Sequence, residues 1–125
     1  MKTKILVVDD SSLTRRTLRG ALEEMGYEVE DVADGARALE AYYLRKPDVV
    51  VLDMVMQGMY GSEVLAKLRE MDPAARVVVA TADIQTSTAE QVKSAGASGI
   101  LNKPINKAEL GQALRTVLAG GQTWN

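Results

Sequence analysis

Two residue types that support much of enzyme chemistry are missing from this sequence of 125 residues, which contains no cysteine and no histidine. Without cysteine there is no disulfide framework, no thiolate nucleophile and no cysteine-type zinc site. Without histidine, Ser-His-Asp triads, histidine general bases and histidine metal sites are excluded. Any bound metal must therefore use oxygen ligands, which favours Mg²⁺, Mn²⁺ or Ca²⁺.

Charge of one sign and long hydrophobic runs are also lacking. The formal net charge of −2 gives no electrostatic case for binding nucleic acid or an acidic membrane surface. The apolar runs are too short to span a bilayer, and the N-terminal segment lacks the features of a signal peptide. With 46% hydrophobic and 26% charged residues, we expect one globular domain in the cytoplasm.

Short apolar segments alternate with segments of helical periodicity along the chain. The predicted strands cover residues 4–9, 27–32, 48–53, 76–81 and 98–102. Helix starts are marked by the capping residues Ser11 or Ser12, Asp34, Ser87 and Asn106. This alternation predicts a parallel sheet with helices on both faces, in which the first, third and fourth strands, being almost wholly apolar, lie in the middle.

Polar side chains follow these apolar strands directly. Asp9 and Asp10 end the first strand, Asp53 ends the third and Thr81 the fourth. Ligands of open parallel sheets bind at the carboxyl ends of the strands, so we expect these residues to meet at one edge. A single aspartate there is more often a turn former. Three together repel each other, and a hard cation such as Mg²⁺ resolves that repulsion.

Lys103 follows the fifth strand in the sequence "NKP" (102–104), where Pro104 restricts the preceding backbone to an extended conformation. A single lysine at such a place is more often a solvated surface charge. Beside an acidic cluster, however, its ammonium can bind a phosphoryl oxygen. Carboxylates, the Thr81 hydroxyl and this ammonium together are typical of phosphoryl transfer, in which an aspartate is a competent acceptor.

Four motifs carry a family resemblance over essentially the whole chain. They are "VVDD" (7–10), "VVVLDMVM" (49–56), "VVVAT" (77–81) and "AGASGILNKP" (95–104). In this order and spacing they resemble the receiver domain of two-component response regulators, of the chemotaxis-regulator-like superfamily. The resemblance implies an α/β fold, a flavodoxin-like (βα)5 three-layer sandwich with a five-stranded parallel sheet of order 2-1-3-4-5. We expect the receiver domain to cover residues 1–120 and the tail, 121–125, to fray.

The resemblance also implies roles for the site residues. Asp53 would take a phosphoryl group from a histidine kinase or phosphotransfer protein, Lys103 would bind that group and Thr81 would move to hydrogen-bond it. Mg²⁺, or Mn²⁺ in its place, would be held by Asp9, Asp10, Asp53 and the backbone carbonyl of Val55. Self-phosphorylation from a phosphodonor and autodephosphorylation would follow, which is not conventional enzyme activity and leaves the enzyme question open.

A surface change is the signal that the resemblance implies. Phosphorylation would alter the face formed by the fourth helix, the fifth strand and the fifth helix. A downstream effector protein or a fused output domain would read that face, and dimerisation through it stays open. No direct contact with nucleic acid or membrane is expected.

Departures from the family pattern concern the switch and the lifetime of the phosphorylated state. Ile100 stands where receivers commonly carry an aromatic residue, and Tyr60 stands where an acidic residue is usual. Gln57 replaces a proline, which predicts a looser loop. Val55 is apolar and predicts a longer phosphorylated lifetime, whereas Asp83 could orient the attacking water and shorten it.

Other classes of protein share parts of this sequence pattern. The chain could be a receiver cut from a larger regulator or hybrid kinase, or a degenerate receiver that signals without phosphate. A small Mg²⁺-dependent phosphatase would need an acid two positions after the nucleophile, where Val55 stands. A flavodoxin would need a phosphate loop rich in serine, threonine and glycine, whereas "DDSSLTRR" (9–16) is acidic and has no glycine.

Overall fold

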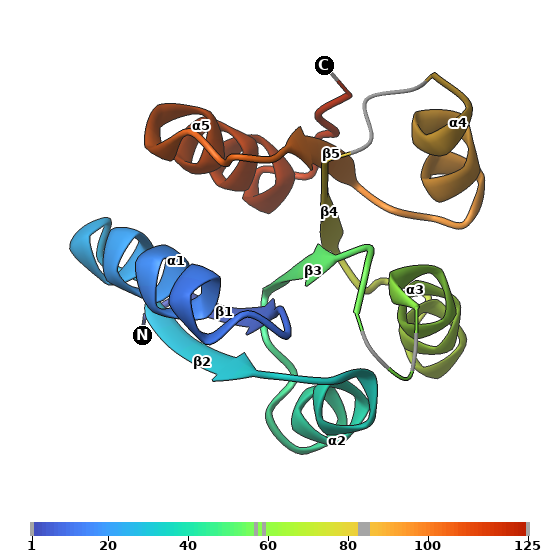
Figure 1. Cartoon of the computed structure of the whole chain (residues 1–125), viewed down its shortest axis with the longest axis horizontal. Coiled ribbons are helices and arrows are strands. Elements are labelled where there is room, and N and C mark those ends of the chain that lie inside the picture. Colours follow the sequence, from blue (N-terminus) through green and yellow to red (C-terminus); the bar gives the residue numbers. More distant parts are fainter. Residues whose placement is uncertain (1, 57, 59, 83–85, 125) are drawn as a thin grey trace.

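The computed structural model describes residues 2–56, 58, 60–82 and 86–124, without the side chains of residues 86 and 87. Strands and helices alternate throughout (Figure 1). The strands are β1 (Lys4–Val8), β2 (Glu28–Val32), β3 (Val49–Asp53), β4 (Val77–Thr81) and β5 (Gly99–Asn102). The helices are α1 (Ser12–Glu24), α2 (Gly35–Arg45), α3 (Gly61–Met71), α4 (Thr86–Ser94) and α5 (Lys107–Leu118). No helix among the described residues is long and apolar enough to cross a membrane.

All five strands are parallel, and their order is β2-β1-β3-β4-β5, which confirms the predicted sheet. The register pairs Val8 with Leu52, Asp53 with Ala80, and Thr81 with Asn102. Because the strands are parallel and nearly level, their carboxyl ends line one edge of the sheet. The residues that follow β1, β3, β4 and β5 are therefore brought together.

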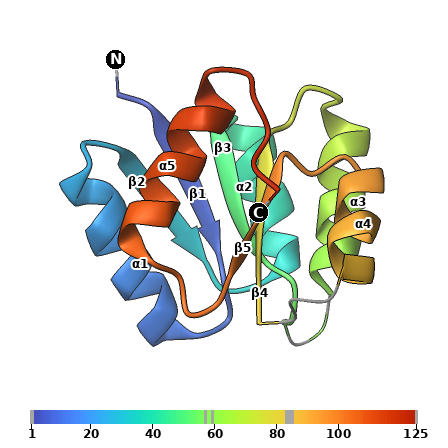
Figure 2. The same cartoon turned by 90° about the horizontal axis from the view of Figure 1, so that it is seen from above.

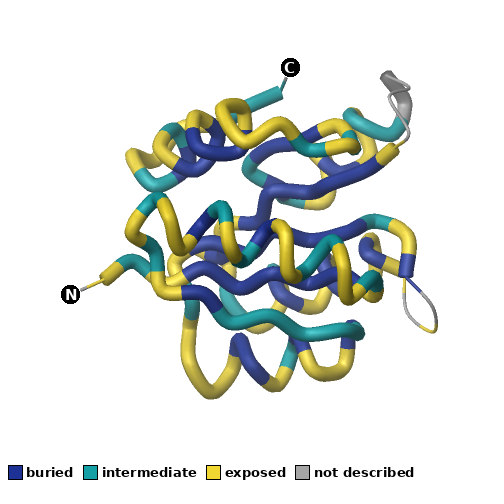
Figure 3. The backbone as a smooth tube through the Cα atoms, turned by 60° about the vertical axis from the view of Figure 1, so that its left-hand side comes forward, coloured by how far each residue is buried: buried dark blue, intermediate teal, exposed yellow. Residues whose placement is uncertain are grey.

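Two apolar layers flank the sheet. Helices α2, α3 and α4 cover one face and α1 and α5 cover the other (Figures 1 and 2). Successive residues of β1 alternate between these layers: Leu6 and Val8 belong to the first, Ile5 and Val7 to the second. The central strands are accordingly buried on both sides, whereas β2 is half exposed at the sheet edge (Figure 3).

Capping residues begin three of the helices as predicted. The Ser11 hydroxyl accepts a hydrogen bond from the Thr14 amide at 3.2 Å, and the Asp34 carboxylate accepts one from the Arg37 amide at 2.8 Å. Asn106 caps α5 in the same way. The predicted start of the fourth helix is wrong by two residues: a cap at Ser87 implies a first helical residue at position 88, whereas α4 begins at Thr86 and includes Ser87. Periodicity locates a helix better than it locates the first turn.

The tail lies against the outer edge of β5. Thr123 forms a parallel bridge with Gly99 and exchanges backbone hydrogen bonds with Ser98 and Ile100, and Trp124 packs against the first apolar layer. The open edge of β5 thus supplies the tail with backbone partners, which the polar and glycine-rich composition of the tail does not indicate.

A buried tyrosine joins α2 to the end of α3. The Tyr42 hydroxyl donates a 2.8 Å hydrogen bond to Asp72 Oδ2, and the same carboxylate accepts the Ala74 amide at 2.9 Å. Burial and the hydrogen bond to Asp72 raise the pKa of Tyr42. The hydrogen bond from Tyr42, then that from Ala74, lowers the pKa of Asp72.

We predict that Tyr42→Phe lowers the free energy of unfolding by about 1 kcal/mol at pH 7. The folded pKa of Asp72 is depressed, so its stabilisation is complete above the ordinary value of about 3.9 and is lost as the pH falls through the folded pKa. Urea unfolding of parent and variant should therefore converge on acidification. Tyr43→Phe, at an exposed tyrosine of the same helix, is the control, and an equal effect there would contradict the assignment.

Candidate functional site

Three carboxylates converge at the carboxyl edge of the sheet. Asp9 follows β1 and Asp53 ends β3; both are buried, with exposed fractions of 2% and 6%. Asp10 lies beside Asp9 and is exposed. One oxygen atom of each of the three lies within 4.8 Å of the others. The structure therefore brings the predicted acidic residues into a single cluster.

The Lys103 ammonium lies between the two buried carboxylates. Its Nζ is 3.0 Å from Asp9 Oδ2 and 3.1 Å from Asp53 Oδ1. The backbone holds this arrangement, because the Lys103 amide donates a 2.8 Å hydrogen bond to the carbonyl of Thr81, at the end of β4. The Thr81 residue is itself 2% exposed. Lys103 and Thr81, predicted as site residues, thus lie at the same sheet edge as the acids.

Burial and hydrogen bonds shift the pKa values of Asp53 and Lys103 in opposite directions. Burial raises the pKa of Asp53, and the nearby Asp9 charge adds to that rise; the hydrogen bonds from Lys103 and the Val55 amide oppose it without cancelling it. For Lys103, burial lowers the pKa, but the hydrogen bonds and charges of Asp9 and Asp53 outweigh burial and raise it. Lys103 therefore stays an ammonium at neutral pH, while an ionised Asp53 stays costly to bury.

Arg15 supports the acidic edge, and the sequence reasoning missed it. Its Nη1 donates a 2.7 Å hydrogen bond to the backbone carbonyl of Asp9, and its Nε contacts Asp31 Oδ1 of β2 at 3.1 Å. The Asp9 carboxylate also accepts the Ser11 amide at 2.9 Å. The available signal was the position of Arg15, about one turn into the helix that follows Asp9.

Gly61 is a second residue whose role the sequence left unseen. A Cβ at this position would lie 2.5 Å from the carbonyl oxygen of Asp53 and 2.6 Å from the Cα of Met54. The Gly61 amide also donates a 3.0 Å hydrogen bond to the Met54 carbonyl. Only glycine permits this approach, so Gly61 fixes the start of α3 against the end of β3.

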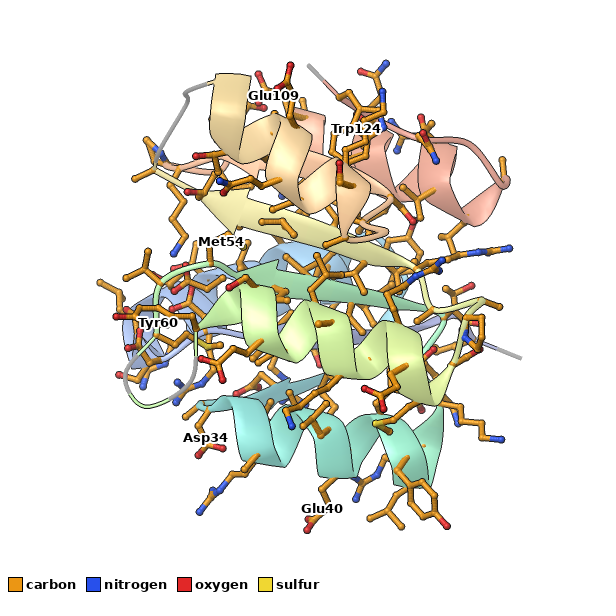
Figure 4. The ribbon with its side chains drawn as sticks, turned by 90° about the vertical axis from the view of Figure 1, so that its right-hand side faces the viewer. Asp34, Glu40, Met54, Tyr60, Glu109 and Trp124 are labelled. Carbon is orange, nitrogen blue, oxygen red and sulfur yellow. The ribbon has the colours of Figure 1, made fainter. Side chains whose placement is uncertain are left out.

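The residues that depart from the family pattern have distinct positions. Val55 is 70% exposed, and its amide donates a 3.2 Å hydrogen bond to Asp53 Oδ1. Tyr60 is 64% exposed where α3 begins (Figure 4). Ile100 is buried within β5, with an exposed fraction of 6%. Gln57 and Asp83 lie outside the described residues.

The donor set suits a hard divalent cation. Three carboxylates offer oxygen ligands from one side, and the exposed position of Asp10 leaves that side accessible to solvent. Mg²⁺ keeps several waters and binds to one or two carboxylates together with phosphate oxygens, which matches such an open cluster. The Lys103 ammonium supplies a further positive charge at the same edge.

Comparison with known proteins gives consistent matches across the chain. The model of the response regulator receiver domain matches residues 5–115. The chemotaxis protein CheY of Halobacterium salinarum is 35% identical over 119 residues, which cover 94% of this chain and 98% of that protein. The response regulator MprA of a Mycobacterium species (strain KMS) is 38% identical over 118 residues, but these span only 51% of its length.

A solved structure of a related protein also matches this chain. The crystal structure of the CheX–CheY–BeF₃–Mg²⁺ complex from Borrelia burgdorferi contains a chain that is 30% identical in sequence, with a TM-score of 0.89. The match covers 92% of this chain and 88% of that one. Sequence and fold therefore point to the same group of proteins.

We predict that Lys103→Met lowers the free energy of unfolding by about 2 kcal/mol in metal-free buffer, because it leaves two buried carboxylates without their counter-charge. Lys107→Met is the matched control, since Lys107 pairs with Glu24 on the surface. That variant should cost at most about 0.5 kcal/mol. Urea unfolding at pH 7 measures both, and equal costs would show that the Lys103 contacts are not stabilising.

Proposed function

Because the chain belongs to the family of response regulator receiver domains, we propose that Asp53 accepts a phosphoryl group in a Mg²⁺-dependent reaction. The observation that carries this proposal is the pairing of a buried strand-end carboxylate with an ammonium, 3.1 Å apart, beside two further aspartates. The donor is a histidine kinase or a phosphotransfer protein. The phosphorylated form is read by another protein or an attached output domain.

The covalent step of the transfer joins a carboxylate oxygen to the phosphorus atom, in line with the leaving group of the donor. An oxygen of ionised Asp53 attacks phosphorus, and an O–P bond forms as the P–N bond of the donor's phosphohistidine breaks. The departing imidazole nitrogen keeps the electron pair of that bond and takes up a proton from solvent. With acetyl phosphate as donor, the bond broken is P–O and acetate leaves. Little covalent catalysis is required beyond positioning and neutralisation of charge.

Charge neutralisation is the contribution of the surrounding residues. Asp9, Asp10, Asp53 and the backbone carbonyl of Val55 would hold Mg²⁺, which supplies positive charge to the phosphoryl oxygens when bound. Lys103 binds another of these oxygens as a point charge. To do so its ammonium shifts from Asp53 Oδ1, where it now lies, towards the new group.

The switch follows from the charge added at Asp53. A phosphoryl group brings nearly two negative charges and new acceptor oxygens. The Thr81 hydroxyl and the Lys103 ammonium are drawn towards them, and the loops after β4 and β5 move with these residues. The surface formed by α4, β5 and α5, here called the α4–β5–α5 surface, changes in consequence.

A second candidate is a receiver joined to further domains. The observation in its favour is that the chain spans about half the length of the response regulator MprA. The phosphoryl chemistry would be the same in that case, and the α4–β5–α5 surface would act on a part of the same polypeptide. A receiver that signals without phosphate is less well supported, because the acids, Thr81 and Lys103 are all in place.

We predict that incubation with acetyl phosphate and Mg²⁺ adds one phosphoryl group to the protein, observed as a gain in intact mass. Asp53→Asn should show no gain, because an amide oxygen is a poor nucleophile. Asp34→Asn is the control, since it changes an aspartate that caps α2 outside the cluster to another good capping residue. A mass gain that persists in Asp53→Asn would exclude Asp53 as the acceptor.

The Val55 side chain leads to a second prediction, which concerns the half-life of the phosphorylated protein. The side chain is apolar and exposed next to the acceptor, so it offers no polar group to orient an attacking water. Val55→Asn should shorten the half-life of the phosphorylated protein about tenfold, which corresponds to a barrier about 1.4 kcal/mol lower. Val55→Ile keeps the apolar character and should leave the half-life near that of the parent.

The half-life is measured by intact mass after the donor is removed. Asp83→Ala should act in the opposite direction and lengthen it, if Asp83 orients water. No change in either Val55→Asn or Asp83→Ala would show that neither side chain controls hydrolysis.

A further inference from the structure

The chain turns back towards the sheet directly after α5. Gly120 has a φ of +93°, and its amide donates to the Val117 carbonyl at 2.9 Å. The Gly121 amide donates to the Thr116 carbonyl at 2.9 Å. These two hydrogen bonds form a Schellman turn, which ends the helix and redirects the backbone. The segment that follows, residues 122–124, is here called the return segment.

The return segment adds to the outer edge of β5. The Thr123 amide donates to the Ser98 carbonyl at 3.0 Å, and the Ile100 amide donates to the Thr123 carbonyl at 3.0 Å. This is the hydrogen-bond pattern of an extended peptide that docks on a strand edge. Figure 2 shows the C-terminal end lying over β5, between α5 and α4.

Gly99 makes room for this docking. A Cβ on Gly99 would lie 2.5 Å from the carbonyl oxygen of Thr123, which is a backbone atom and cannot rotate away. Gly99 has no positive φ, so its own conformation does not demand glycine. The absence of a side chain at this position therefore serves the close approach of the return segment.

Trp124 connects the return segment to α4. Its indole is partly buried against the apolar layer that contains Val92 and Ile100. The Lys93 ammonium lies 5.5 Å from the ring centroid, within the range of a cation–π interaction. The indole Nε1 donates to Gln122 Oε1 at 3.0 Å. Figure 4 shows Trp124 beside α4, on the same side of the molecule as Glu109 of α5.

These contacts place the return segment on the α4–β5–α5 surface. A groove of about 490 Å³ there is lined by β5, by α5 and by the segment itself, including Trp124. The indole thus lies at the edge of the strand that carries Ile100, the position at which an aromatic residue was expected and is lacking. An aromatic group is therefore present beside β5, but it is the side chain of Trp124, which follows the C-terminal end of α5.

We propose that the return segment is an intramolecular ligand of the β5 edge: it closes the α4–β5–α5 surface in the unphosphorylated protein and is released when Asp53 is phosphorylated. This inference rests on the proposed function. Movement of Thr81 and Lys103 shifts the backbone at the ends of β4 and β5, which their 2.8 Å hydrogen bond joins. Trp124 spans β5 and α4, so displacement of one against the other removes its contacts.

The coupling between phosphorylation and the return segment acts equally in both directions, and this gives a measurable consequence. If phosphorylation releases the return segment, then loss of the segment must favour the phosphorylated form by the same factor. A coupling at the lower end of the usual range corresponds to about fivefold. Beryllofluoride, a mimic of the phosphoryl group, makes this a binding equilibrium that can be titrated.

The test uses the full chain with Mg²⁺ and beryllofluoride, titrated by calorimetry. Gly99→Ala and Trp124→Ala should each bind beryllofluoride about fivefold more tightly than the parent. The first acts inside the sheet and the second outside it, so a folding defect in one leaves the other informative. Gly20→Ala, at an exposed helix position where a Cβ meets nothing within 4 Å, should bind as the parent does.

Fluorescence follows the segment directly, because Trp124 is the single tryptophan of the chain. Beryllofluoride should shift the parent's emission to longer wavelength and expose the indole to acrylamide quenching. A parent that binds beryllofluoride without either change, or two variants that bind with parental affinity, overturns this inference and leaves the proposed function standing. A parent that gains no phosphoryl group by mass and binds no beryllofluoride overturns both.

Discussion

The arrangement of the candidate site depends on how the carboxyl edge of the parallel sheet accommodates three negatively charged side chains. Three carboxylates gather there because parallel strands carry their C-terminal residues to a common edge. Two of these side chains are buried, which is unfavourable unless a cation lies between them. In the polypeptide itself the Lys103 ammonium fills that role at 3.0 and 3.1 Å. The site can therefore accept an anion, because the Lys103 ammonium can contact the anion as well as the carboxylates.

Backbone contacts around the site hold its charged residues in place. Gly61 brings α3 against the backbone of Asp53, and Arg15 ties the backbone of Asp9 to β2. The Lys103 amide links the ends of β4 and β5. Each contact holds main chain in place, whereas the groups that we propose to move on phosphorylation, the Lys103 ammonium and the Thr81 hydroxyl, belong to side chains. A pocket that must bind a transient group benefits from this division between a fixed frame and adjustable cations and hydroxyls.

Much of this architecture could be predicted from the sequence. Apolar runs without alternation identified the central strands, and their terminal aspartates identified the site edge, because both follow from the geometry of a parallel sheet. The strand order needed the family resemblance. Gly61 and Gly99 escaped prediction, since a close approach between segments distant in sequence leaves no local pattern. The contacts of the return segment could not be predicted for a related reason: its backbone partners, Ser98 and Ile100, lie before α5 in the chain.

The two edges of the sheet also differ in how they avoid unwanted pairing. On β2, the outer strand carries Glu28, Glu30 and Asp31, and arginine side chains pair with Glu30 and Asp31; charged side chains of this kind on an edge strand disfavour pairing with another strand. At β5, Thr123 already occupies one backbone donor, the Ile100 amide, and one acceptor, the Ser98 carbonyl. Copies of this chain that met edge to edge would thus encounter charged side chains on one side and a partly occupied strand on the other. Pairing of strand edges is therefore disfavoured at both ends of the sheet, and displacement of the return segment would expose the edge of β5.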